Sequence, residues 1–246
     1  MIESKINIKS HFYDLTESVN IENNIDDIVT QICSHDRQLI NFYWLGKCSY
    51  NPIWKLQKKL HQLRIDKKIN DIVLLLEHNH VYTLGKNADS NHILPSKPDN
   101  VEIVNIDRGG DVTYHGPGQL VGYPIFDLHN YKMSITWYIK LISDSLISLL
   151  DEFNIKAYYN DDYIGIWVED EKIAALGIRL AKWVTMHGFA LNINTDLNYF
   201  NGMIPCGIFE HGVTSINQIN NEKLDVKEIA KIYSEHFLKK LSKEIN

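Results

Sequence analysis

Apolar residues recur at helical spacing behind three polar residues that can cap a helix: Asn51, Ser134 and Asp225. Between these segments lie short apolar runs that predict strands. The predicted strands span residues 71–76, 101–106, 119–128, 155–158, 163–168, 172–180 and 184–193. Because strands outnumber the long helices between them, the order predicts an α+β fold, with a mixed sheet flanked by helices, rather than a doubly wound parallel sheet.

The first forty residues lack this pattern, because they are polar with scattered apolar positions and no sustained period. We therefore predict that residues 1–40 form an extension of uncertain structure. No long linker rich in glycine, serine or proline interrupts the chain after Phe42. Residues 41–246 are accordingly expected to form one domain.

Composition excludes several classes of protein. Lys and Arg number 25 against 31 Asp and Glu, and this net charge of −6 counts against nucleic-acid binding. Three cysteines, Cys33, Cys48 and Cys206, form no CxxC pair, which favours a reducing compartment over a disulfide scaffold. The longest clean apolar run, 72–76, is too short to span a membrane, and no secretory signal is evident. We expect a soluble intracellular protein.

A glycine-rich stretch at residues 107–119 reads DRGGDVTYHGPGQ and follows a predicted strand. Four glycines accompany Arg108 and His115 within eleven residues. Glycines let backbone N–H groups approach a ligand, so this density favours a binding loop over a simple tight hairpin. Neither the phosphate-binding GxxxxGK[ST] nor the dinucleotide-binding GxGxxG pattern is present.

Cys206 lies between a proline and a glycine, which predicts a loop. A lone cysteine in an intracellular protein is more often a small buried hydrophobe than a nucleophile. It becomes reactive only where a neighbour lowers its pKa from about 8.5. Candidate activators are Lys172, His187 and His115. Lys172 is either a solvated lysine at a strand edge or a buried partner that shuttles the proton of the thiol.

His78 and His80 form a His-x-His pair, a workable pair of metal ligands on one strand face. A third ligand at recognisable spacing is missing from the sequence. We therefore expect no metal site.

Residues 108–120 resemble, without a gap, the signature R-G-G-x-x-T-[aromatic]-H-x-P-G-Q-L of the lipoyl(octanoyl) transferases of lipoate biosynthesis. Other motifs similar to those of this family occur in order at 77–78, 81–85, 165–168, 172–177, 187–192 and 205–207. The resemblance runs from about Tyr43 to Ile219. It fails at Asn79 and His80, where the family usually has two prolines, so these two residues are given no function.

The resemblance implies the α+β fold shared with biotin and lipoate protein ligases. It implies that an octanoyl group moves from the thioester of acyl carrier protein to a lysine of lipoyl domains, in 2-oxoacid dehydrogenases and the glycine cleavage H protein. By similarity, Cys206 holds the acyl-thioester intermediate and Lys172 is its activating base. The implied substrate-binding residues are Arg108, Gly109, Gly110, Asp111, Val112, Thr113, Tyr114, His115, Ala175, Leu176, Gly177, Gly188, Phe189 and Ala190. No cofactor and no ATP are expected, and the expected location is the cytoplasm, or an organelle in a eukaryote.

Three other functions remain open at this stage. An ATP-dependent lipoate or biotin protein ligase would share the fold and need no nucleophilic cysteine. A non-catalytic module could bind acyl carrier protein or lipoyl domains, and a thioesterase-like hydrolase could use Cys–His chemistry. The presence of both Cys206 and Lys172, and the absence of a GRGRxG motif, favour the transferase.

Overall fold

A computed structural model of the protein describes residues 9–17, 24–36, 40–204 and 211–245. Within these residues, the strands of the main sheet follow the order β1-β2-β3-β7-β11-β10-β9-β8, and β12 pairs with β10. Strands β1, β2 and β3 are parallel, whereas β3, β7, β11, β10, β9 and β8 are antiparallel neighbours. The bounds are β1 Ser10–Asp14, β2 Ile40–Cys48, β3 Ile72–His78, β7 Gln119–Ile125, β8 Tyr158–Asn160, β9 Gly165–Val168, β10 Glu171–Ala181, β11 Val184–Asn192 and β12 Gly212–Val213. The predicted mixed sheet is confirmed.

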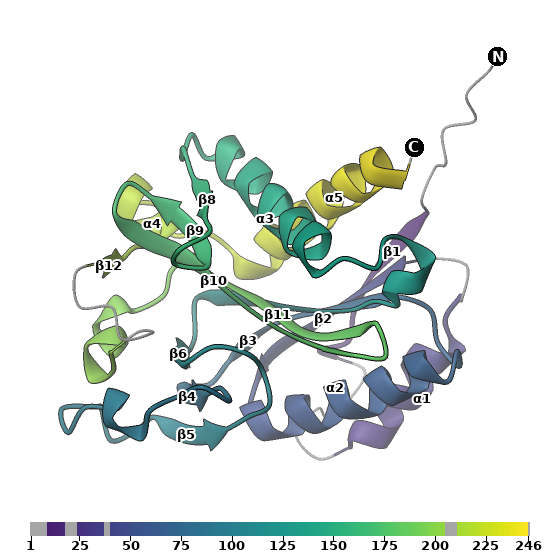
Figure 1. Ribbon diagram of the computed structural model, residues 1–246, viewed down its shortest axis with the longest axis horizontal. Helices are drawn as coiled ribbons and strands as arrows, with labels where there is room; N and C mark the ends of the chain where they lie inside the picture. The colour runs from purple at the N-terminus through teal and green to yellow at the C-terminus, as the bar shows by residue number, and fades with distance from the viewer. Residues whose placement is uncertain (1–8, 18–23, 37–39, 205–210, 246) are drawn as a thin grey trace.

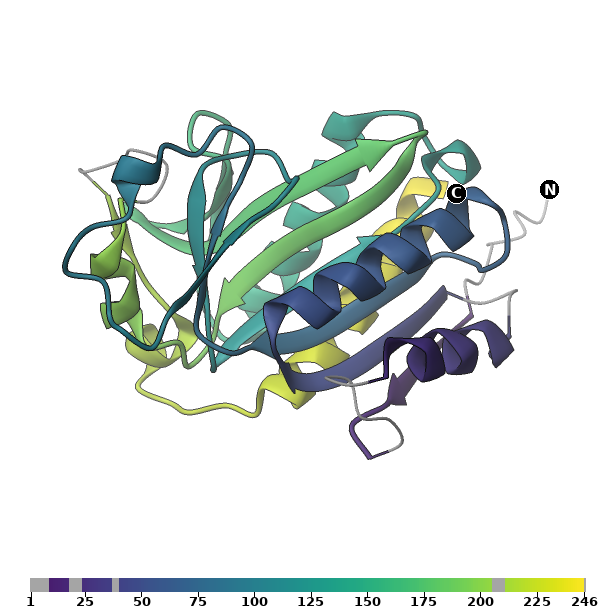
Figure 2. The ribbon, with the colours of Figure 1, turned by 90° about the horizontal axis from the view of Figure 1, so that it is seen from below.

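Helices cover both faces of this sheet (Figure 1). On one face lie α3 (Ile135–Glu152) and α5 (Val226–Ile245), and on the other lie α1 (Ile25–Ser34) and α2 (Tyr50–Ile65). Figure 2 shows α2 running across the sheet, with α1 beside it. Strand β3 is consequently buried on both sides, which is why its sequence is a continuous apolar run and not an alternating one.

A second, three-stranded sheet lies at one end of the molecule (Figure 1). Its order is β5-β4-β6, with β4 spanning Val81–Leu84, β5 Glu102–Asn105 and β6 Val112–His115. Strand β6 is formed by part of the glycine-rich stretch. The remaining elements of the described residues are helix α4 (Ile216–Asn220) and the 3₁₀ segments Ser90–His92, Leu128–Asn130 and Leu197–Gly202.

The predicted helix starts are partly right. Ser134 caps α3 as expected, because its Oγ accepts the N–H of Trp137 at 3.2 Å. Asn51 does not cap α2. That helix begins one residue earlier, at Tyr50, and the side chain of Asn51 instead donates to Glu102 on β5.

The predicted strand at 155–158 is wrong, since β8 begins only at Tyr158. Asn154 adopts a left-handed conformation that ends α3, with φ at +58°. The N–H of Ile155 then returns to the carbonyl of Leu150 at 3.1 Å. The apolar Ile155 therefore belongs to a helix terminus.

The described part of residues 1–40 joins the main sheet. Strand β1 pairs with β2 in parallel, and α1 packs on α2. Leu15, Ile28 and Ile32 are buried in the same apolar cluster as residues of β2 and β3. This segment thus covers one edge and part of one face of the sheet (Figure 2).

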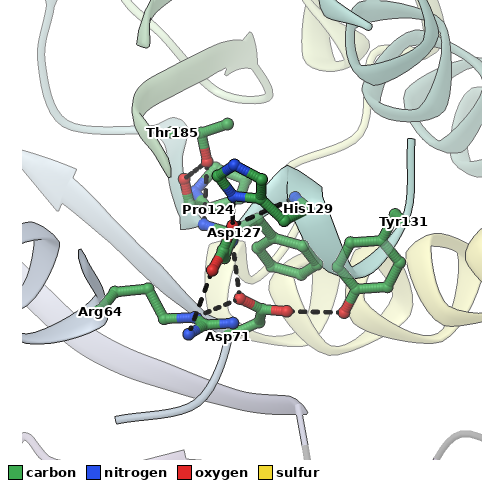
Figure 3. A network of polar contacts seen from close by, with 8 residues as sticks. Arg64, Asp71, Pro124, Asp127, His129, Tyr131 and Thr185 are labelled. Carbon is green, nitrogen blue, oxygen red and sulfur yellow. Dashed lines mark hydrogen bonds and ion pairs between the residues drawn. The ribbon is translucent and has the colours of Figure 1, made fainter. Parts of the chain in front are cut away.

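A buried polar network joins the end of α2 to the start of β3 (Figure 3). The Nε of Arg64 donates to Asp71 Oδ1 at 2.6 Å, and its Nη1 lies 3.7 Å from Asp127 Oδ2. Tyr131 donates its hydroxyl to Asp71 Oδ2 at 2.7 Å. Burial raises the pKa of Asp71, and the charge of Arg64 acts against that rise. The network therefore depends on Arg64 for its cation.

We predict that Arg64→Met lowers the free energy of unfolding by about 3–5 kcal/mol, because it leaves two buried carboxyl groups without their cation. Urea denaturation at pH 7 measures this change. Lys68→Met removes an exposed cation just beyond the same helix and is expected to cost less than about 0.5 kcal/mol. Similar costs for the two variants would contradict a stabilising role of the network.

Candidate functional site

A pocket lies between strands β10 and β11 of the main sheet and the glycine-rich stretch. All the predicted substrate-binding residues except Gly109 and Tyr114 line it, and so does Lys172. Three separate sequence motifs therefore meet in one cavity. Their role in binding stays a prediction.

The register of β10 against β11 explains why two of these motifs meet. Ala175 lies opposite Ala190, and Gly177 lies opposite Gly188, so residues 175–177 and 188–190 form facing pairs of one antiparallel ladder. The β-hairpin between them brings together positions that are distant in sequence. The pocket wall on this side thus combines two alanines and two glycines with the larger side chains of Leu176 and Phe189.

Arg108 fixes the opposite wall. Its Nη2 donates to the carbonyl oxygen of Thr83 at 2.8 Å, and its Nη1 donates to the carbonyl oxygen of Gly109 at 2.9 Å. The aliphatic part of the side chain lies against Gly177, where an added Cβ would be only 3.1 Å from Arg108 Cδ. Arg108 therefore lines the pocket with its stem, while its guanidinium joins the loop to β4.

The turn after β4 holds the loop in place through its backbone. Gly85, Lys86 and Asn87 donate N–H groups to the carbonyls of Asp111, Arg108 and Gly110, at 3.3, 3.1 and 3.3 Å respectively. A Cβ on Gly85 would collide with the carbonyl oxygen of Gly110. Glycine at position 85 is therefore required for this close approach.

Hydrogen bonds also position the end of the glycine-rich stretch. The N–H of Gly118 donates to Glu77 Oε2 at 2.6 Å, and Gln119 Nε2 donates to Asn192 Oδ1 at 2.9 Å. Glu77, one of the motif residues found by resemblance, thus orients the turn into β7. These contacts tie the pocket to the centre of the main sheet.

Lys172 is half-buried on β10 beside the pocket. It pairs with Trp167 of β9 and with Val213 of β12, so it does not lie on a free strand edge. Its Nζ lies 5.0 Å from the centroid of a Trp167 ring. A lysine on a free strand edge does not fit this pairing, and the role of Lys172 as a base stays a prediction.

Cys206 lies outside the described residues, but the residues that flank it approach the pocket. The N–H of Ile204 donates to the carbonyl of His92, and His92 Nδ1 lies 2.6 Å from Asp111 Oδ2. On the other side, the ring of His211 contacts Trp167, with centroids 5.3 Å apart. Both flanks of residues 205–210 thus adjoin residues next to or lining the pocket.

Two buried histidines, His78 of β3 and His115 of the glycine-rich stretch, lie close together. His78 Nε2 lies 2.8 Å from Tyr123 Oη and its Nδ1 lies 3.1 Å from the carbonyl of Cys48. His115 Nδ1 lies 2.9 Å from Gln119 Oε1. Burial lowers the pKa of His78 to about 4 and holds that of His115 well below its ordinary value. Both rings are therefore neutral at pH 7.

The buried ring of His187 pairs with a partly exposed acid that sequence analysis did not single out. Its Nε2 donates to Asp107 Oδ1 at 3.1 Å, and Asp107 Oδ2 accepts from Arg179 Nη1 at 2.7 Å. The hydrogen bond from His187 and the charge of Arg179 hold the pKa of Asp107 well below its usual range. Burial lowers the pKa of His187. Two features of the sequence could have pointed to this cluster. Arg179 is a charged residue between the apolar residues Ile178 and Leu180, and Asp107 is the first residue of the glycine-rich stretch.

His78 and His80 have separate hydrogen-bond partners. His80 Nδ1 lies 2.7 Å from Tyr114 Oη and its ring stacks on Tyr199, whereas both nitrogens of His78 are hydrogen-bonded elsewhere. In the part of the chain that the structure describes, no group of three His, Cys, Asp or Glu is arranged to hold a metal ion.

Residues 49–238 match the model of the lipoyl protein ligase A/B catalytic domain. The octanoyltransferase of Caldicellulosiruptor bescii is 41% identical over 213 residues, which cover 84% of this chain and 93% of the relative. That of Desulforamulus reducens is 44% identical over 192 residues, covering 76% of this chain and 84% of the relative. The chain belongs to the octanoyltransferase family.

Solved structures place this octanoyltransferase fold among the protein ligases. A chain of an archaeal lipoylation system from Thermoplasma acidophilum, a bipartite lipoate protein ligase with its E2 lipoyl domain, superposes with a TM-score of 0.61. That match is 13% identical and covers 80% of this chain and 83% of the other. Biotin protein ligase from Aquifex aeolicus, in complex with biotin and ATP, superposes with a TM-score of 0.52 at 14% identity, covering 83% and 72%.

The predictions of family, fold and enzyme class are therefore confirmed, and octanoyl transfer is the activity of this chain. Identity this low between the superposed structures shows the fold alone. Among the described helices of this octanoyltransferase, none is both long and apolar enough to cross a membrane.

The neutral histidines predict a pH dependence of stability. Unfolded His78 binds a proton below about pH 6.5, whereas the folded ring does so only near pH 4. The free energy of unfolding is thus greatest above pH 6.5 and falls as the pH drops from 6.5 toward 4. His78 alone is expected to contribute about 2 kcal/mol of loss between pH 7 and pH 5.

Urea denaturation at the two pH values measures this loss. His78→Gln should reduce the difference between pH 7 and pH 5 by about that amount. His11→Gln removes an exposed histidine of β1 and is the matched control. If His78→Gln retains the full pH dependence of the wild type, the buried ring is not its source.

Proposed function

We propose that the chain transfers an octanoyl group from the thioester of octanoyl-acyl carrier protein to a lysine of lipoyl domains, with Cys206 as nucleophile and Lys172 as base. The acceptors are the lipoyl domains of 2-oxoacid dehydrogenases and the glycine cleavage H protein, and the reaction takes place in the cytoplasm. All described pocket residues lie between Tyr50 and Val213, which supports residues 41–246 as the catalytic part.

The observation that carries the proposal is the position of Lys172 at the pocket, with its Nζ over the same Trp167 that His211 contacts. Cys206 lies two residues after Ile204 and five before His211. The described residues on both sides of this segment adjoin the pocket, which supports a role for Cys206 there. An ammonium group close to a thiol favours the thiolate.

The two alternative activators are weaker candidates than Lys172. Burial lowers the pKa of both His115 and His187, so neither ring carries the positive charge that would stabilise a thiolate at neutral pH. Each ring also has a hydrogen-bond partner, Gln119 for His115 and Asp107 for His187. Of the three candidates, Lys172 is therefore the one that we propose for proton transfer.

The chemistry proceeds in two acyl transfers. In the first, Cys206 Sγ bonds to the octanoyl carbonyl carbon, the bond to the carrier sulfur breaks, and Lys172 returns a proton to the departing thiolate. In the second, the amine of the acceptor lysine attacks the new thioester, Lys172 takes its proton, and Cys206 leaves as a thiolate. The donor is already an activated thioester, so no ATP is consumed.

Cys206 is predicted to carry the acyl group. Incubation with octanoyl-acyl carrier protein should add one octanoyl mass to the intact protein, with and without ATP. Cys206→Ser should abolish the adduct, whereas Cys33→Ser removes a free cysteine elsewhere and should keep it. An adduct on Cys33 or Cys48 would overturn the assignment, and a dependence on ATP would favour a ligase.

Lys172→Met is predicted to slow alkylation of Cys206 by iodoacetamide at neutral pH. Without the ammonium, the pH at which the thiol becomes reactive should rise toward about 8.5. Lys172→Arg should not restore turnover, because guanidinium keeps the charge but cannot act as a base. Lys182→Met, which removes an exposed lysine at the β10–β11 turn, is the matched control. Unchanged alkylation and transfer in Lys172→Met would exclude the lysine.

A further inference from the structure

The residues that line the pocket differ between its two ends. Ile164, which lines it near Lys172, is 49% exposed. The register of β10 against β11 places His187 at the other end, where its ring meets the buried ring of Tyr123, which also lines the pocket. Such polar rings would add no affinity for an apolar acyl chain if they lay in the middle of the pocket walls. Their position identifies an inner end, where the chain has to stop.

The ladder between β10 and β11 gives the scale of the pocket. His187 pairs with Ile178, six residues along β10 from Lys172. Six strand residues span about 20 Å. An extended octanoyl group, with seven C–C bonds of about 1.5 Å, spans about 9 Å from carbonyl carbon to methyl carbon. With the side chains of Lys172 and His187 entering from the two ends, the remaining length suits a medium-length acyl chain.

His187 is held in place from several sides. Its φ of +61° is unusual for a histidine inside a strand. Its N–H donates to Gln57 Oε1 at 3.0 Å, its Nε2 donates to Asp107, and its ring meets that of Tyr123 edge to face at 6.2 Å. The ring is therefore fixed by backbone conformation and by hydrogen bonds at once.

The charged residues on the other side of the His187 ring are partly exposed to solvent. The side chain of His187 is 2% exposed, whereas those of Asp107 and Arg179 are 27% and 32% exposed. The imidazole thus separates the pocket from a charged pair at the surface. Its Nδ1 is buried and has no hydrogen-bond partner among the described residues.

We propose that the His187 ring, held by Asp107, closes the inner end of the acyl pocket and limits the length of the acyl chain that the enzyme transfers. A longer chain would have to press methylene groups against the buried His187 Nδ1, or push the ring away from its hydrogen bond with Asp107. Either change costs free energy, because it places apolar groups against a buried polar atom or breaks a hydrogen bond. This inference rests on the proposed function, in which the acyl carbonyl lies at the Lys172 end.

The test compares octanoyl-, decanoyl- and dodecanoyl-acyl carrier protein as donors for the full-length enzyme, with transfer to a lipoyl domain as the readout. In His187→Gly the ratio of kcat/KM for dodecanoyl over octanoyl should rise by at least about tenfold, because extra methylenes gain a place. Glycine suits the positive φ. His187→Asn also tolerates that conformation and should shift the ratio less, in the same direction.

His61→Ala is the matched control. His61 is a buried histidine of α2 whose Nε2 lies 3.1 Å from the carbonyl of Val184, on the same strand as His187, but it does not line the pocket. Its ratio should equal that of the wild type. Asp107→Ala leaves the His187 ring without its main partner and should raise the ratio as well.

The outcomes separate the two proposals. If the wild type transfers no acyl chain at all, the proposed function fails. If it transfers octanoyl while the ratio in both His187 variants stays within about twofold of the wild type, the limit lies elsewhere and this inference fails alone. Circular dichroism identifies a variant that does not fold, and the other His187 variant then decides.

Discussion

The guanidinium of Arg108 is buried between the two sheets, and a buried charge is stable only where polar groups satisfy it. Carbonyl oxygens of Thr83 and Gly109 do so, and this ties the glycine-rich stretch to the small sheet. The stem of the same residue touches Gly177 of the main sheet. One side chain therefore contacts both sheets beside the pocket.

The polarity of the pocket follows from burial. At the inner end, the His187 ring is kept neutral because it is removed from water. At the other end, Lys172 is only half-buried, between Trp167 and Val213. The proposed chemistry and the proposed limit on chain length thus lie at opposite ends of one strand pair, and strand geometry fixes their separation.

The same fold serves lipoate and biotin protein ligases. A shared fold does not decide between an activated thioester and ATP as the source of acyl energy. The reacting side chains do, and in the proposal these are Cys206 and Lys172. The buried network around Arg64 lies at the other end of α2, away from Tyr50, the pocket residue of that helix.

The sequence by itself determined the mixed fold, the long helices, the family and most pocket residues, because these depend on local periodicity and on contiguous motifs such as residues 108–120. It misplaced the strand at 155–158, where a helix terminus buries an apolar residue, and left β1 and α1 unassigned. Only the tertiary structure showed that Lys172 is paired on both sides and that Asp107, Arg179 and His187 form one cluster. Such contacts join residues up to eighty positions apart. They depend on strand register and on the loss of water around buried groups, which a linear pattern of residues does not contain.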